Sequence, residues 1–289
     1  MQPTFILLGL AIFSVWLPSI QLSSRLTIAP WTILFFAATA TGTALGILSV
    51  PALASIILFG AATWSSLHVR SRWGAGLLMC LSITMAILLA LHLLPGFRNP
   101  RLYDGIRLST NSIPFKQYLN FDKGTAGLFL LAAFCARISK ASDLKFVFNR
   151  FIYAIILFTP AIVIGTAVAF GAVRFDPKIP VLAVAFLGAN LLFTCVAEEA
   201  FFRGVFQERL SQIFGEKNIF RWLPVLLSTI FFAGMHFDGG IPYMILVALA
   251  GLGYSLAYAI SRRIEAAILA HFILNAVHFL FFTYPLATR

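Results

Sequence analysis

The sequence predicts an all-α fold, a polytopic membrane helix bundle with about eight to ten transmembrane helices, and two observations support this prediction. Of the 289 residues, 60% are hydrophobic and only 11% are charged, and the mean hydropathy is +0.93. A soluble domain is about half apolar and roughly a quarter charged, so this apolar excess cannot be buried inside one water-facing globule. The apolar residues also form long runs without period-two alternation, which favours membrane helices over strands.

Ten apolar runs divide the chain, most of them close to the length of about 20 residues that a helix needs to cross the hydrocarbon layer. They lie near residues 4–22, 31–49, 51–68, 73–95, 124–137, 151–173, 180–210, 221–237, 241–260 and 264–284. The first run has no charged segment before it and no convincing cleavage site after it, so we expect a first span rather than a signal peptide. The run at 124–137 is short for a full crossing, and 180–210 is long enough to protrude into water.

A polar stretch at 96–123 separates an N-terminal group of spans from a C-terminal group. We therefore expect N-terminal transmembrane helices with a polar loop over 1–123, where the sequence matches no motif, and a second domain over 124–289. With ten spans, twelve Lys and Arg residues collect on one side of the membrane and eight on the other. The positive-inside rule then predicts a cytoplasmic loop at 211–221.

The net charge of +11 is explained by basic loops that face lipid headgroups. Membrane lipids are therefore expected partners. Nucleic acid is not expected, because the low content of acidic residues and Asn argues against a chain that coats nucleic acid.

Two of the ten acidic residues lie away from the predicted loops. Glu198 and Glu199 occur in the apolar run LLFTCVAEEAFFRGVF, where an ionisable group is costly and by default marks a functional site. Arg203 follows Glu199 by four residues, a spacing that places both side chains on one helical face and predicts an ion pair. The alternative is a snorkelling Arg203 beside an unrelated Glu199.

Glu198 points away from that pair, because neighbouring residues on a helix differ by about 100°. Its own face carries Thr194 and Asn190, four and eight residues earlier, and no oppositely charged residue. A partner for the Glu198 carboxylate must therefore come from another part of the chain.

Histidines are the expected partners. His236 ends the run STIFFAGMHF, and His271 shares a face of the run AHFILNAVHF with Asn275 at a spacing of four. A carboxylate that faces imidazoles and an amide suits activation of water and stabilisation of an oxyanion, the two needs of peptide hydrolysis. The remaining histidines, His68, His92 and His278, are interpreted as core residues, and Cys80, Cys135 and Cys195 as packing residues.

A hairpin would bring Glu198 and His236 to the same depth in the membrane. If the runs 180–210 and 221–237 turn about Lys217, each of the two residues lies 19 positions from the turn. His271 follows the Arg262 turn by nine residues, which places it somewhat shallower in the membrane unless a deeper turn compensates.

Three motifs follow one another inside these spans: EExxxR (Glu198, Glu199, Arg203), FxxxH (Phe232 to His236) and HxxxN (His271 to Asn275). Their order resembles the CPBP family, also called Abi, of intramembrane proteases that includes the type II CAAX prenyl endopeptidases. The resemblance covers roughly 150–285 and implies a CPBP/Abi-like protease core within 124–289. It also implies roles for single residues. Glu198 and His236 would activate the hydrolytic water, His271 and Asn275 would hold the oxyanion, and Glu199 and Arg203 would support the site.

The expected function is an intramembrane endopeptidase that hydrolyses a peptide bond of a membrane-associated peptide or protein by glutamate-activated water. No cofactor is expected because the zinc signature HExxH is absent, although zinc is an alternative with Glu198, His236 and His271 as ligands. The buried Glu and His residues would also suit an ion- or proton-coupled transporter, and an inactive scaffold could retain the same motifs for packing. The missing internal repeat and the HxxxN pair count against a transporter. The expected location is the inner (cell) membrane of a bacterium, and whether the substrate is lipidated stays open.

Overall fold

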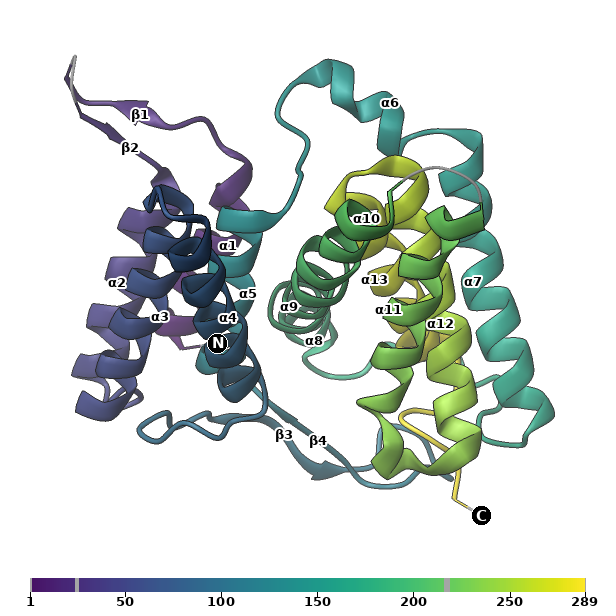
Figure 1. The fold of residues 1–289 in the computed structure, drawn as a ribbon. Helices are drawn as coiled ribbons and strands as arrows, with labels where there is room; N and C mark the ends of the chain where they lie inside the picture. Colours follow the sequence, from purple (N-terminus) through teal and green to yellow (C-terminus); the bar gives the residue numbers. More distant parts are fainter. Residues whose placement is uncertain (1, 24–25, 216–218, 289) are drawn as a thin grey trace. The chain divides into compact units, whose positions relative to one another are not determined.

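The computed structural model describes residues 2–23, 26–215 and 219–288, and helices make up most of it (Figure 1). Each of the ten apolar runs is helical over most of its length. Within the described part of the chain, six helical segments are long and apolar enough to cross a membrane, and Pro3–Trp16 and Ile219–Gly234 are shorter apolar helices. The predicted all-α polytopic membrane bundle is thereby confirmed, whereas six of the described segments have the length to span where eight to ten spans were expected.

The chain forms two compact units, and each is described by itself. The N-terminal unit comprises Met1–Arg101, Tyr118–Cys135 and Leu191–Glu198, and the C-terminal unit comprises Leu102–Gln117, Ala136–Asn190 and Glu199–Arg289. One of the unit limits therefore falls between Glu198 and Glu199.

The N-terminal unit is a group of apolar helices packed around phenylalanines. Its helices are α1 (Pro3–Phe13), α2 (Pro30–Ala44), α3 (Val50–His68), α4 (Arg72–Ala90) and α5 (Phe121–Phe134), and a short antiparallel pair, β1 (Ile20–Gln21) and β2 (Thr27–Ile28), joins α1 to α2. Proline occupies the first turn of α1, α2 and α3, where its missing N–H leaves no hydrogen bond unmade. The Phe129 ring contacts Phe35 and Phe59 at centroid distances of 5.0 and 5.1 Å, which fixes α5 against α2 and α3.

The C-terminal unit is organised around one central helix. Its regular helices are α6 (Leu144–Val147), α7 (Arg150–Ala169), α8 (Ala183–Ala189), α10 (Glu208–Phe214), α11 (Leu223–Gly234), α12 (Gly240–Ser261) and α13 (Ile264–Phe281). Helix α12 packs against α7, α11 and α13, which run alongside it in Figure 1. Asn149 caps α7 by accepting hydrogen bonds from the backbone N–H groups of Phe151 and Ile152.

The polar stretch at 96–123 contains two strands where the sequence indicated only turns. β3 (Arg101–Ile106) pairs with β4 (Phe115–Tyr118), and most of this hairpin belongs to the C-terminal unit. Tyr103 from β3 is 4% exposed and packs in a small core with Phe186 and Phe279, whose rings stack at 3.7 Å. The hairpin is therefore part of the packed structure and does more than connect two groups of spans.

Hydrogen bonds and an ion pair tie the loop before α6 to the start of α13. The Ser139 N–H donates to Asp143, Arg263 lies 3.4 Å from the same carboxylate, and both interactions hold the Asp143 pKa below its usual value. The Ile138 N–H donates to Glu265 at 2.8 Å. These contacts fix one end of the helix that carries His271 and Asn275.

Some residues expected in the interior lie at the surface. Cys80, His68 and His92 are exposed, so their interpretation as packing or core residues is wrong, whereas Cys135 and Cys195 are buried. Arg25, Lys217 and Arg289, which entered the charge count and the hairpin prediction, lie outside the described residues. The cytoplasmic position of the 211–221 loop and the domain limits at 123 and 124 therefore stay predictions.

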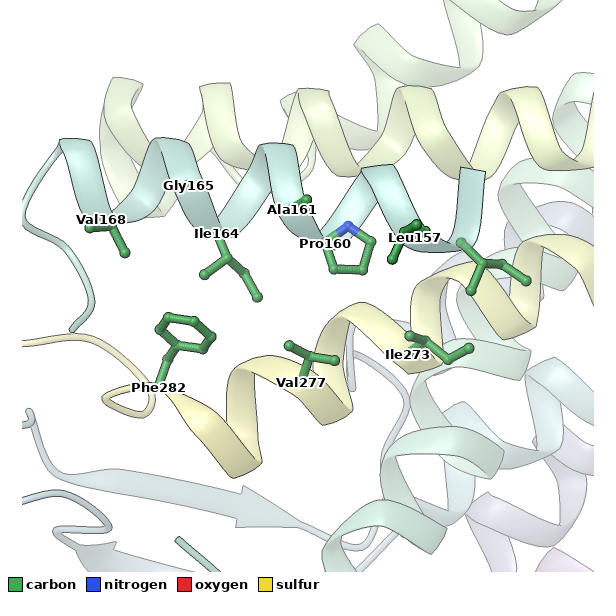
Figure 2. A pocket seen from close by; sticks show the side chains of 10 residues that line it. Leu157, Pro160, Ala161, Ile164, Gly165, Val168, Ile273, Val277 and Phe282 are labelled. Carbon is green, nitrogen blue, oxygen red and sulfur yellow. The ribbon is translucent and has the colours of Figure 1, made fainter. Parts of the chain in front are cut away.

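An apolar groove of about 520 Å³ lies between α7 and α13 (Figure 2). Pro160 and Ile164 of α7 line one wall, and Ile273 and Val277 of α13 line the other. Ile273 and Val277 are each two residues from Asn275, which places them about 200° around the helix from it. The groove therefore lies on a different face of α13 from this candidate site residue.

Candidate active site

The two adjacent glutamates lie between two stretches of π-helix. The helix Ala183–Phe214 changes to π geometry in η3 (Asn190–Cys195), returns to one α-turn in α9 (Val196–Glu199), and changes again in η4 (Ala200–Gln207). π-helical turns are rare and occur frequently at functional sites. The expected face shared by Asn190, Thr194 and Glu198 assumed 3.6 residues per turn, whereas residues 190–195 are π-helical, and the shared face stays a prediction.

Glu199 and Arg203 form the ion pair that their spacing predicts. Arg203 Nε lies 3.2 Å from Glu199 Oε2, and both side chains are 0% exposed. The guanidinium also donates to the Gly251 carbonyl oxygen at 3.0 Å and lies over the Phe232 ring at 4.6 Å. Arg203 thus connects η4 to α11 and α12, which argues against the snorkelling alternative.

His271 is the second partner of Glu199. Its Nδ1 lies 2.7 Å from Glu199 Oε1, and the His271 ring is stacked on Tyr254 at 4.5 Å. The structure thus contains a buried row in which the Glu199 carboxylate lies between the Arg203 guanidinium and the His271 imidazole. A carboxylate can only accept at this contact, so His271 Nδ1 carries the proton. The sequence spacing assigned Glu199 to Arg203 alone and gave no sign of this contact with His271.

His236 is oriented by the phenylalanine of its own motif. His236 Nδ1 lies 2.8 Å from the Phe232 carbonyl oxygen, so Nδ1 carries a proton and the lone pair is on Nε2. The Phe232 ring lies 4.9 Å from His236 and 6.2 Å from His271. Phe232 therefore contacts both histidines and Arg203. The spacing of four between Phe232 and His236 is the sequence signal that points to it.

Asn275 lies close to Asn190 in the same unit. Its Nδ2 donates to Asn190 Oδ1 at 3.2 Å, which orients the amide group of Asn275 and uses one of its two N–H donors. Asn190 follows directly from α8, so this bond ties α13 to the helix that leads to the glutamates.

Glu198 belongs to the N-terminal unit and has a charged partner there. Lys123 Nζ lies 2.7 Å from Glu198 Oε1, and the two side chains are 18% and 17% exposed. The sequence pointed only to histidines as partners, and Lys123, which stands at the end of the polar stretch, was missed. His236 and His271 belong to the C-terminal unit, so the grouping of Glu198 with the histidines stays a prediction. Within each unit, the described residues contain no group of three His, Cys, Asp or Glu side chains placed to hold a metal.

A comparison with protein families finds one match. Residues 180–277 match the family model described as type II CAAX prenyl endopeptidase Rce1-like. No curated protein and no solved structure matches the chain. The matched segment contains all seven residues of the three motifs, and it excludes α1 to α5.

Glu199→Gln is expected to destabilise the protein, because it leaves Arg203 buried without its anionic partner. Breaking a buried ion pair costs roughly 3–5 kcal/mol, and removing both charges costs less than the sum of the single losses. Thermal unfolding of Glu199→Gln, Arg203→Met and the double variant in lipid nanodiscs measures the coupling. Glu208→Gln is the matched control, because Glu208 is 20% exposed, pairs with the 39% exposed Arg262 at 3.3 Å and accepts from the Tyr258 hydroxyl at 3.0 Å, and a partly exposed pair is worth less than a buried one. If the losses of stability in the two single variants simply add up in the double variant, Glu199 and Arg203 do not form an ion pair.

Proposed function

We propose a reaction for this chain from the match of residues 180–277 to the Rce1-like family of type II CAAX prenyl endopeptidases. The family match gives no support to the transporter alternative. The chain is proposed to hydrolyse a peptide bond of a membrane-associated peptide or protein with a water molecule that Glu198 activates. The observation that carries the proposal is the buried row Arg203, Glu199 and His271, directly next to Glu198 in the sequence.

Glu198 is proposed as the general base. Its carboxylate removes a proton from water while the water oxygen attacks the carbonyl carbon of the scissile bond, and the carbonyl π electrons move to the oxygen. His236 is proposed to assist: its Nδ1 lies against the Phe232 carbonyl oxygen, so Nε2 is the nitrogen that would accept a hydrogen bond from the same water. When the C–N bond breaks, Glu198 returns the proton to the leaving amine.

His271 and Asn275 are proposed to stabilise the oxyanion. Asn275 would donate from its side-chain amide, which its bond to Asn190 Oδ1 orients. His271 donates from Nε2 when both ring nitrogens carry protons, and the Glu199 carboxylate on Nδ1 stabilises that cationic ring. Glu199 and Arg203 thus act through His271 and need not contact the substrate.

For the substrate and the membrane we propose only a class of substrate and a location. The family name refers to prenylated peptides. We propose a membrane-proximal peptide as the substrate class and a bacterial inner membrane as the location. Comparing the peptide termini in membrane fractions from cells with wild-type protein and with Glu198→Gln would identify the substrate.

Glu198→Gln is expected to abolish cleavage while the protein stays folded, because the amide cannot take a proton from water. Loss of a general base typically costs about 10² to 10⁴ in rate. The assay uses purified protein in nanodiscs with a fluorogenic peptide that carries a farnesyl or a palmitoyl group on a cysteine near its C-terminus. Glu208→Gln makes the same chemical change on the same helical segment and serves as the control. Turnover by Glu198→Gln at the wild-type rate would exclude Glu198 as the base.

Activity is expected to survive removal of metal ions. A catalytic zinc is normally held by three protein ligands, whereas a carboxylate between imidazoles can activate water by itself. Dialysis against a zinc chelator should leave the cleavage rate unchanged, with thermal unfolding recorded in parallel to detect a structural metal. Stoichiometric zinc, with activity that is lost on its removal and regained on its return, would assign Glu198, His236 and His271 as ligands.

A further inference from the structure

We propose that Lys123 is a positioning residue for Glu198, and that the N-terminal unit supplies it. The inference rests on the proposed function of Glu198 as the base. Lys123 lies outside the segment 180–277 that matches the family, so this contribution to the site comes from a part of the chain that the family match does not cover.

The first support is the contact itself. Lys123 Nζ lies 2.7 Å from Glu198 Oε1, and both side chains are more than four-fifths buried. Lys123 occupies the first turn of α5, where the positive end of the helix dipole disfavours a cation. Hydrophobic packing does not favour a lysine at this position either. The Glu198 carboxylate compensates the Lys123 charge, and Lys123 in turn fixes the direction of the carboxylate.

The second support is the close packing of α5 against the segment that carries Glu198. A Cβ atom on Gly127 would lie 2.7 Å from Ala197 Cα, so only glycine allows this approach. Gly124, one turn earlier, has a similar role, because a Cβ there would lie 3.1 Å from Phe193 Cδ1. Lys123 and Gly127 are four residues apart and share a face of α5. The same face that packs against Ala197 therefore presents the ammonium group to Glu198.

The third support is a polar network that holds the start of α5. Asp122 is 1% exposed, and its carboxylate contacts His92 Nδ1 at 2.7 Å and accepts from Asn99 Nδ2 at 3.0 Å. The side-chain oxygen Oδ1 of Asn99 accepts a hydrogen bond from the Phe121 backbone N–H at 2.9 Å. His92 has a left-handed backbone with φ of 59°, a costly conformation for a residue with a side chain. The network determines where α5 begins, and hence where Lys123 lies.

The role follows from the geometry that a base requires. A carboxylate on a helix can rotate among several conformers, and only some of them direct an oxygen towards the water and the scissile carbonyl. The Lys123 contact restricts Glu198 through Oε1. Because a displacement of about 1 Å can cost about 10²-fold in rate, loss of this contact should lower kcat and leave substrate binding nearly unchanged.

The test compares Lys123→Met, Lys123→Arg and Glu198→Gln in the fluorogenic peptide assay. Lys116→Met, at an exposed lysine of β4, is the matched control. We expect Lys123→Met to lose about 10- to 100-fold in kcat with KM within about threefold of wild type, and Lys123→Arg to recover most of the loss. Wild-type kcat in Lys123→Met, or equal losses in Lys123→Met and Lys123→Arg, would overturn the proposal.

A second measurement needs no substrate. Melting temperatures of Lys123→Met, Glu198→Gln and the double variant show whether the two side chains are coupled. We expect the melting temperature of the double variant to fall by less than the sum of the decreases in the two single variants. Additive decreases in melting temperature would overturn the proposal. If Lys123→Met does not fold, Lys123→Gln replaces it under the same criteria. A fully active Glu198→Gln would refute the proposed function, whereas a fully active Lys123→Met beside an inactive Glu198→Gln refutes only the role of Lys123.

Discussion

The C-terminal unit depends on one buried carboxylate. Glu199 lies between Arg203 and His271, and each of its neighbours is held by a further contact: Arg203 by the Gly251 carbonyl and the Phe232 ring, and His271 by the Tyr254 ring. A buried charge of either sign is costly unless it is paired and hydrogen-bonded. The packing of η4, α11, α12 and α13 therefore depends on the presence of all three groups together. The same contacts orient the histidine that we assign to the oxyanion.

The adjacent glutamates have different environments, and this difference separates their roles. Glu199 is completely buried and paired within the C-terminal unit, whereas Glu198 is partly exposed and pairs with Lys123 in the N-terminal unit. A neutralised, inaccessible carboxylate can support a histidine but cannot take a proton from water. The partly accessible Glu198 is therefore the glutamate that we propose as the base. The N-terminal helices would then contribute to catalysis by fixing its position.

The helices and the motif residues could be predicted from the sequence because long apolar runs and the i, i+4 spacings are local properties. The Glu199 and Arg203 pair is such a case. The contacts of Lys123 and His271 could not be predicted, because each joins residues more than 70 positions apart through tertiary packing. The change to π-helix in η3 and η4 was also missed. A π-turn differs from an α-turn by one residue in its backbone hydrogen bond, i→i+5 in place of i→i+4, and the spacing of residues in the sequence does not distinguish the two.

The most direct test of the central role of Glu199 is solid-state ¹⁵N NMR of the protein with labelled histidine in lipid bilayers. The sequence has five histidines, and the His271 signal is identified by its loss in His271→Gln. We predict a protonated, strongly hydrogen-bonded Nδ1 in His271, whose resonance shifts in Glu199→Gln and stays unchanged in Glu208→Gln. A His271 ring with the same signals in wild type and Glu199→Gln would contradict the central role of the Glu199 carboxylate.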